Sequence, residues 1–322
     1  MASLLERLGV ELPIVQAGMG GGLSRHELAA AVSEAGGLGT IGTLSPEGIS
    51  RELAAARKLT GKPLAVNLLL PYSHRRHFDA AAGADVLVTF WGKPRRRTER
   101  TWIHQCGSLA EALEARRAGA NGLIVQGVEA GGHVRGTTPA LDLLEQVRHE
   151  LPDGYPLWLA GNIADSADVK RVLDAGAEAA VLGTRFLMSE ESRARNAYKQ
   201  RLTESRETVL TELFGLGWPA AQHRVIWNEA AERWLKAGSE RRPTWVLAAN
   251  RILSPPLKRI PESLQFRLMR TQRATVPFFS PQPITDVAPS NLLDAGPLYA
   301  GQSVARIHDI RPAAELVHAL AS

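Results

Sequence analysis

The stretch PLWLAGNIADSADVKRVLDAGAEAAVLGTRF, residues 156–186, contains the unit from which most of the chain is built. Two short apolar runs, Pro156–Ala160 and Ala179–Gly183, flank a helical pattern that Asp165 opens and Gly176 ends. Both runs are continuously apolar rather than alternating, which is typical of parallel strands buried on both faces. The stretch therefore predicts a strand, a helix and a second strand parallel to the first.

The same unit recurs toward the N-terminus. Six further apolar runs, most with turn residues beside them, bring the number of predicted strands to eight: Pro13–Ala17, Leu38–Gly42, Pro63–Leu68, Asp85–Trp91, Thr101–Cys106 and Asn121–Gln126. Helical patterns separate most of these runs. Because eight such units favour closure into a ring over an open sheet, we predict an α/β protein with a (β/α)₈ (TIM) barrel.

Start and stop signals accompany the predicted helices. Ser24 and Ser108 each stand three residues before a glutamate, Glu27 and Glu111, which is the spacing of a capping box. Ser45 precedes a proline, a residue favoured at the first helical position. Glycine, the usual C-terminal signal, ends three of the helices, at Gly36, Gly119 and Gly176.

The 322 residues exceed what these units need, because the last predicted strand ends at Gly183. We expect residues 1–205 and 298–322 to form the barrel, with Pro312–Ala321 as its last helix. Residues 206–297 lack strand–helix alternation and carry four of the seven tryptophans. We interpret them as a small, mainly helical C-terminal domain that forms a lid or substrate domain, with a helical stretch near 220–238.

Composition limits the class of protein. The chain is 44% hydrophobic and 22% charged, which is typical of a globular protein. It has neither the apolar run of a membrane helix nor the apolar core of a signal peptide. A single cysteine, Cys106, excludes an internal disulfide and fits a reduced cytoplasmic location. No cysteine–histidine array has metal-ligand spacing, so we expect no metal.

Charge is uneven along the chain. The segment Arg185–Thr275 holds 17 basic and 9 acidic residues, a net charge of +8 against +5 for the whole chain. The simple interpretation is a solvated arginine-rich surface. The functional one is a basic patch that attracts an anionic ligand or an acidic partner. Nucleic acid fits less well, since no regular aromatic interleaving or DNA-binding motif accompanies the charge.

The ends of the predicted strands hold the candidate functional residues, because barrel active sites form at that edge. Glycines end the seventh and eighth strands at Gly161 and Gly183, where barrels bind phosphate, and Thr184 adds a hydroxyl donor. Two amides, Asn67 and Gln126, also lie at strand ends. One amide can both donate and accept, which suits the edge of a planar heterocycle.

One histidine belongs to this set. His133 ends the segment EAGGH, whose glycines let the backbone approach a ligand, and a histidine can accept a proton near neutral pH. By contrast, the literal match to a dinucleotide fingerprint, GLGTIG (37–42), lies before and within a predicted strand. A real fingerprint follows the strand and opens a helix, so we interpret these glycines as structural.

At these residues the sequence resembles the nitronate monooxygenase family. The matching stretches cover nearly the whole chain: PIVQAGMGGGLS (13–24), EAGGLGTIG (34–42), VNLLLP (66–71), IVQGVEAGGH (124–133), GNIADSADV (161–169), GAEAAVLGTRFLMSEES (176–192) and AGQSV (300–304). The most specific part is the combination of the QGVEAGGH and GTRF segments. The family commonly has Gly-Gly-Ile where this chain has Gly161-Asn162-Ile163.

The resemblance implies a barrel that binds FMN non-covalently, with a small helical domain over the flavin. Carried over to this sequence, Gly18 and Met19 line the flavin, Asn67 and Gln126 bind its ring or ribityl chain, and Gly161, Gly183 and Thr184 hold its phosphate. His133 is the implied catalytic base. The implied flavin-binding set is completed by Ala17, Gly131, Gly132, Asn162 and Gln302.

Two enzymatic functions remain open. The first is oxidation of an alkyl nitronate or nitroalkane by O₂ to a carbonyl compound and nitrite, with His133 taking the α-proton of a nitroalkane. The substrate is then a small, anionic molecule. The second is FMN-dependent reduction by NAD(P)H, of the enoyl-acyl-carrier-protein reductase or quinone reductase type. A flavin-binding barrel without turnover is a third interpretation, because fold alone does not fix function. A homodimer is also left open.

Overall fold

The computed structural model describes residues 2–235, 244–257, 267 and 270–322. Eight parallel strands form a barrel in the order β1-β9-β8-β6-β5-β4-β3-β2. A parallel bridge between Val15 and Leu38 joins β1 to the chain just before β2 and closes the ring. The strands are β1 (Ile14–Gln16), β2 (Gly39–Ile41), β3 (Leu64–Leu69), β4 (Val86–Phe90), β5 (Thr101–Cys106), β6 (Gly122–Gln126), β8 (Leu157–Ala160) and β9 (Ala179–Leu182). All eight predicted strands and the TIM barrel are confirmed.

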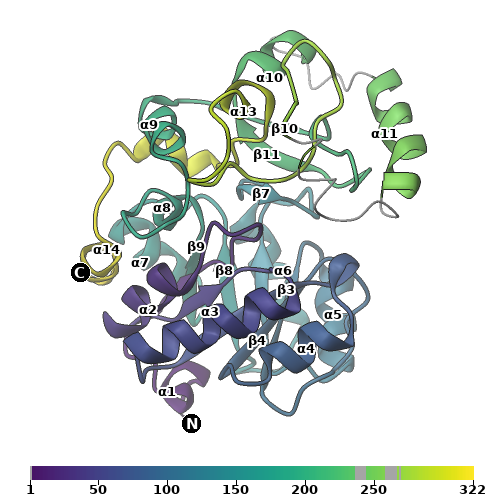
Figure 1. Ribbon diagram of the computed structural model, residues 1–322. Coiled ribbons are helices and arrows are strands. Elements are labelled where there is room, and N and C mark those ends of the chain that lie inside the picture. The colour runs from purple at the N-terminus through teal and green to yellow at the C-terminus, as the bar shows by residue number, and fades with distance from the viewer. Residues whose placement is uncertain (1, 236–243, 258–266, 268–269) are drawn as a thin grey trace.

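Helices surround the barrel on its outer side (Figure 1). The last helix of the chain, which the sequence predicted, packs between the helices that follow β1 and β8. The barrel helices are α1 (Leu4–Leu8), α2 (His26–Glu34), α3 (Pro46–Leu59), η1 (Leu70–Tyr72), α4 (Arg75–Ala81), α5 (Leu109–Arg117), α6 (Ala140–Glu150), α7 (Ser166–Asp174), α8 (Thr184–Leu187) and α14 (Ala313–Ala321).

The core has two layers that follow from the alternation of side chains along each strand. Inward-facing residues such as Val15, Ile103 and Trp158 fill the barrel, and Leu4 and Leu5 of α1 pack against them. Residues of opposite orientation, such as Ile14, pack against the surrounding helices. The barrel interior is therefore filled with side chains, which leaves the ends of the strands for ligand binding.

The helix signals were mostly correct. Ser45, Ser108 and Asp165 each accept a hydrogen bond from a backbone N–H of the first helical turn. The predicted cap at Ser24 is wrong, since α2 begins one residue later, after Arg25, and has no side-chain cap. The buried Ser24 hydroxyl instead contacts both the N–H and the C=O of Met19. It ties down the loop after β1.

The glycines of the GLGTIG segment are structural, as expected. A Cβ at Gly39 would lie 1.9 Å from the carbonyl oxygen of Ala29, and one at Gly42 would lie 2.0 Å from that of Met19. Only glycine permits this close approach of backbone to backbone. The segment packs β2 against its neighbours.

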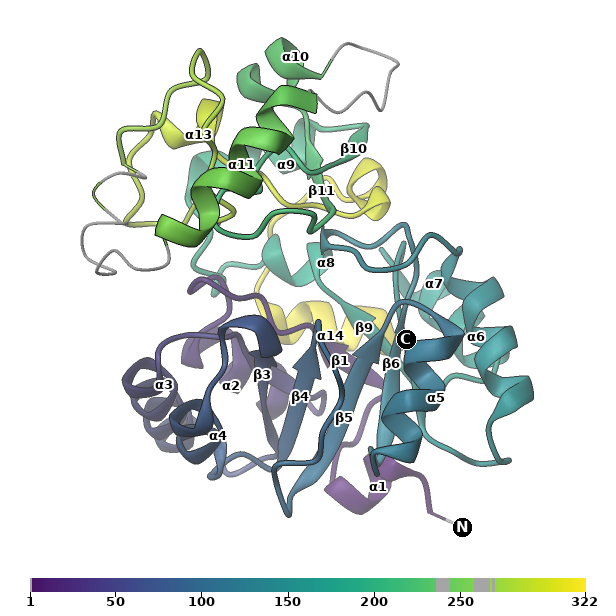
Figure 2. The same ribbon diagram turned by 90° about the vertical axis from the view of Figure 1, so that its right-hand side faces the viewer.

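The described part of residues 206–297 lies beyond the carboxyl ends of the barrel strands, which the arrowheads of β4 and β5 mark in Figure 2. This part of the chain, with the neighbouring residues that join it to the barrel, contains α9 (Asn196–Glu204), β10 (Thr208–Thr211), β11 (His223–Ile226), α10 (Glu229–Trp234), α11 (Thr244–Leu257), α13 (Leu292–Ala295) and η2 (Gln302–Arg306). The helical stretch predicted near 220–238 is correct only at α10, because His223–Ile226 is a strand. Residues 236–238 lie outside the described residues.

The two strands of this region pair with a segment of the barrel. Strands β10 and β11 are antiparallel, and β11 also pairs with β7 (Gly132–His133), which belongs to the loop after β6. His133 lies opposite His223 in this register. The short sheet β10-β11-β7 therefore joins residues 206–297 to the barrel at the candidate base.

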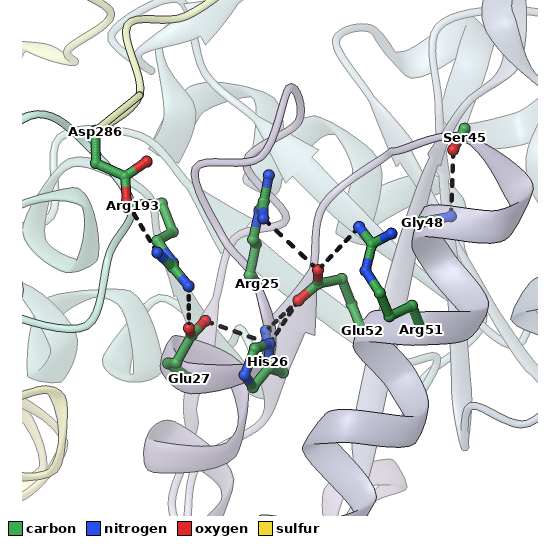
Figure 3. A network of polar contacts seen from close by, with 9 residues as sticks. All are labelled: Arg25, His26, Glu27, Ser45, Gly48, Arg51, Glu52, Arg193 and Asp286. Carbon is green, nitrogen blue, oxygen red and sulfur yellow. Dashed lines mark hydrogen bonds and ion pairs between the residues drawn. The ribbon is translucent and has the colours of Figure 1, made fainter. Parts of the chain in front are cut away.

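Ion pairs also join the two regions. Nη2 of Arg193 pairs with Glu27 of α2. Its Nη1 lies 2.9 Å from Oδ2 of Asp286 (Figure 3). His26, Glu27 and Glu52 place potential metal-ligand atoms near one another. Arginines already balance both carboxylates, so this cluster is explained as a network of ion pairs. Among the described residues, no helix has both the length and the hydropathy needed to span a lipid bilayer.

Candidate active site

A cavity of about 1560 Å³ lies at the carboxyl ends of the barrel strands. Its volume exceeds the range of roughly 300–1,000 Å³ that is usual for small-molecule sites. The structure brings twelve of the predicted site residues together in its wall: Ala17, Gly18, Met19, Asn67, Gln126, Gly131, Gly132, His133, Gly161, Asn162, Gly183 and Thr184. Gln302 is exposed and lies outside the wall, although its neighbours Gly301 and Ser303 belong to it.

The loop after β1 is held close to β3. A Cβ at Gly18 would lie 2.3 Å from the Cβ of Asn67, so only glycine allows this approach. The hydroxyl of Thr43 donates to the main-chain oxygen of Asn67 at 2.8 Å and fixes that strand end. Asn67 itself is only 5% exposed. This wall therefore presents backbone and one amide to a ligand, with little side-chain bulk.

The hydroxyl hydrogen of Thr184 has no acceptor among the described residues. Its Oγ1 accepts a hydrogen bond of 2.9 Å from the N–H of Gly301. Because the oxygen is already an acceptor, its own O–H can donate elsewhere. The backbone beside it is open, since a Cβ at Gly183 would meet no atom closer than 3.8 Å. These features suit an oxygen-rich anion at the end of β9.

The end of β8 has an unusual backbone. Gly161 has φ of 134°, and Asn162 has φ of 54°, a left-handed conformation that asparagine tolerates better than most residues. Arg306 donates to the main-chain oxygen of Asn162 at 3.1 Å and to its Oδ1 at 3.3 Å. Since Arg306 fixes the amide oxygen, the amide nitrogen is the side-chain group of Asn162 that can donate to a ligand.

Gln126 and His133 each have a buried polar atom without a partner among the described residues. Nε2 of Gln126 donates to the main-chain oxygen of His133 at 3.0 Å, while its Oε1 accepts nothing. Nε2 of His133 is likewise unpartnered. Buried polar atoms without partners are rare in native proteins, so two in one cavity wall indicate a ligand.

Aromatic rings surround His133. Its imidazole stacks on Trp218 with 4.0 Å between ring centroids, and the rings of Trp91, His223 and Tyr299 lie within 6 Å. Burial, with a smaller contribution from His223, lowers the pKa of His133 well below its usual value. The imidazole is therefore neutral at physiological pH and has a lone pair that can accept a proton.

Sequence reasoning missed several residues of this site. Trp91 ends a predicted strand and was available as a candidate by position alone. Trp218 and Tyr299 come from the region of residues 206–299, and no local pattern indicates that they contact His133. Glu129, within the EAGGH motif, has a structural role, because its carboxylate accepts from the N–H of Ala140 at the start of α6.

The residues present fit FMN. Glycine-lined strand ends, a free hydroxyl hydrogen at Thr184 and an unpartnered amide oxygen at Gln126 match a phosphate and a heterocycle with donor edges. The cavity is large enough for the flavin and a substrate together. Fold and site thus define a TIM-barrel enzyme with room for a nucleotide-like cofactor.

Comparison with known families agrees with this class. The profile of the family "Nitronate monooxygenase" matches residues 2–91 and 93–322. The chain belongs to the nitronate monooxygenase family. It is accordingly an oxidoreductase, and members of this family are flavoproteins.

Individual relatives have related names. A "Probable nitronate monooxygenase" of Staphylococcus saprophyticus is 31% identical over 280 residues, covering 69% of this chain and 77% of the relative. A nitroalkane oxidase from Streptomyces ansochromogenes has a TM-score of 0.74 at 28% identity. The match covers 99% of this chain and 97% of the nitroalkane oxidase chain. FabK from Thermotoga maritima has a TM-score of 0.77 at 25% identity, with coverage of 98% and 94%.

Proposed function

We propose that this protein binds FMN non-covalently and oxidises alkyl nitronates or nitroalkanes with O₂ to a carbonyl compound and nitrite. FMN supplies the redox chemistry, and the protein supplies orientation and electrostatics. The observation that carries the proposal is the neutral His133, whose unpartnered Nε2 lies at the cavity wall. Family membership and the fold shared with nitroalkane oxidase support it.

The proposed binding residues have distinct tasks. Gly18 and Met19 lie along the flavin ring, while Asn67 and Gln126 contact its edge or the ribityl chain. The phosphate binds where β8 and β9 end, at a place lined by backbone and small side chains: Gly161, Asn162, Gly183 and Thr184. The described part of residues 206–297 acts as a lid, because Trp218 from this region covers His133.

The proposed role of His133 is to accept the α-proton of a neutral nitroalkane. A nitronate has already lost this proton, so its oxidation does not need the base. In the His133→Ala variant we expect kcat/KM for neutral nitroethane to fall about 100-fold or more, within the usual contribution of general base catalysis. The value for ethyl nitronate should change less than fivefold.

Nitrite release and oxygen uptake measure both reactions, and the flavin absorbance spectrum shows that the variant still binds FMN. Equal loss with both substrate forms would contradict a base role. If the wild-type protein with bound FMN released no nitrite from either form, the proposed function would itself be wrong.

The second candidate is an NAD(P)H-dependent reductase. The similarity to FabK fits it less well than the family match and the similarity to nitroalkane oxidase fit nitronate oxidation. Anaerobic mixing with NADPH or NADH separates the two candidates. Rapid bleaching of the flavin absorbance supports the reductase, whereas negligible bleaching together with nitrite release supports nitronate oxidation.

A further inference from the structure

The cavity extends well beyond the strand ends proposed to hold FMN. Its outer part runs between the loops after β1 and β2 and the segment around residues 271–287. Much of this outer wall is apolar and open to solvent. Val276, Phe278 and Val287 are 47%, 38% and 77% exposed. Apolar surface that lines a cavity is typical of a ligand-binding groove.

One cation in this outer wall lacks hydrogen-bond partners. Arg25 donates no hydrogen bond to any described residue, and its Nε is buried without a partner. Its one ion pair with a described residue is a 3.7 Å contact between Nη1 and Glu52 (Figure 3). A guanidinium has five N–H groups, which match the oxygens of a carboxylate or phosphate. Arg25 is therefore prepared to bind an oxyanion.

Glu52 is not the counterion of Arg25 alone, because it also pairs with two other residues. His26 Nδ1 contacts Glu52 Oε2 at 2.5 Å, and Arg51 lies 3.4 Å from Oε1. The carboxylate is thus shared, with the longest contact going to Arg25. Gly22, whose φ is 91°, makes room for the guanidinium, since a Cβ there would lie 3.0 Å from Nη2. Sequence and packing place the positive charge at the cavity wall without a full counterion.

The position of Arg25 limits what the ligand can be. Arg25 follows β1 and precedes β2, whereas His133 follows β6, and these strands lie on nearly opposite sides of the ring. Eight strands about 4.8 Å apart, tilted by about 36°, give a barrel roughly 15 Å across. At about 1.2 Å of reach per bond, an extended chain of roughly a dozen bonds spans a ring of this width.

We propose that Arg25 binds the distal oxyanion of a long amphipathic substrate whose other end reacts beside His133. The substrate class is an apolar chain of about twelve bonds that ends in a carboxylate or phosphate, and its apolar body lies along Val276, Phe278 and Val287. This inference rests on the proposed function for the reacting end, but the binding of the anionic end can be tested alone.

The binding test uses non-reacting probes. Tryptophan fluorescence of the FMN-loaded protein is titrated with dodecanoate, dodecyl phosphate and 1-dodecanol, since Trp218 lines the cavity. We expect one or both anions to bind about tenfold more tightly than the alcohol, and Arg25→Gln to remove this difference while Arg25→Lys retains part of it. Arg51→Gln is the matched control, because Arg51 also pairs with Glu52 but does not line the cavity.

The kinetic test compares the nitronates of 12-nitrododecanoate, 1-nitrododecane and 4-nitrobutanoate. Wild-type protein should prefer the first over the second about tenfold in kcat/KM, Arg25→Gln should lose the preference, and the short 4-nitrobutanoate should gain nothing from Arg25.

Equal values for the charged and neutral long chains, or a preference that survives Arg25→Gln, would overturn the proposal. FMN affinity should be the same in wild type and Arg25→Gln; a loss would assign Arg25 to the flavin phosphate instead. Absence of nitrite from every nitronate would refute the proposed function and leave the fluorescence result to decide on Arg25.

Discussion

At the scale of single residues, the surroundings of His133 determine how the proposed base behaves. The ring is stacked on Trp218, its Nε2 is buried, and burial lowers its pKa. A base acts only in its neutral form, so activity falls as pH drops through its pKa. A lowered pKa shifts this fall to more acidic conditions and keeps the base neutral across the physiological range.

A pH profile tests this environment. For neutral nitroethane, kcat/KM in the wild-type protein should stay constant as pH falls from 7 to 6 and decline only at lower pH. In Trp218→Ala, which hydrates the imidazole, the decline should begin at a higher pH, nearer the ordinary histidine value of about 6.5. The profile for ethyl nitronate serves as a control for effects unrelated to the base. An unshifted profile in Trp218→Ala would show that the indole does not set the pKa of His133.

At the scale of secondary-structure elements, two serines with the same sequence pattern have different tasks. Ser108 caps α5 by accepting from the N–H of Glu111. Ser24 holds the N–H and C=O of Met19 in the loop that lines the cavity. One hydroxyl stabilises a helix, and the other shapes the proposed flavin site.

Substitution of these serines separates stability from cofactor binding. Ser108→Ala should lower the free energy of unfolding by about 1 kcal/mol, the usual cost of a lost N-cap, with no change in FMN affinity. Ser24→Ala should weaken FMN binding several-fold, because the Met19 loop loses its anchor. Chemical denaturation and flavin fluorescence titration measure the two effects. Unchanged FMN affinity in Ser24→Ala would mean that the loop keeps its shape without the hydroxyl.

The same comparison shows what could be predicted from the sequence. Parallel strands were identifiable because strands buried on both faces are continuously apolar, and Gly36 marked a helix end because its φ of 91° favours glycine. Strand β11 was missed because His223 pairs with His133, ninety residues away. Likewise, the sequence around Arg25 predicts only an ordinary surface cation. Tertiary packing is needed to show that its guanidinium donates no hydrogen bond to a described residue.

At the scale of the whole molecule, several histidines are buried in neutral form. Burial lowers the pKa of His104, in β5, and of His223, in β11, to about 4. In the unfolded chain both have a pKa near 6.5, so below that pH the unfolded state binds more protons. Folding stability is therefore fully present above pH 6.5 and is lost as pH falls toward 4.

This linkage predicts a measurable acid sensitivity. Each of these two histidines should lower the free energy of unfolding by about 3 kcal/mol between pH 7 and pH 4. The change appears as a steep decline in denaturation midpoint over that range. In His104→Asn the amide can replace the contact of Nδ1 with the Thr89 hydroxyl. The free energy of unfolding of this variant should fall less steeply with pH, because one proton fewer binds on unfolding. A slope identical to that of the wild type would show that His104 does not contribute.

The strand β7 has a consequence for how substrate reaches the site. Because Gly132 and His133 are hydrogen-bonded to β11, the proposed base belongs to the lid's sheet as much as to the barrel. A hinge that swung the lid outward would have to break this pairing or carry the imidazole away from the flavin. Substrate exchange without loss of the catalytic geometry must then use a side entrance. The outer part of the cavity, lined by Arg25 and by residues 271–287, is the candidate for this entrance, so selection of substrate and its admission would occur at the same place.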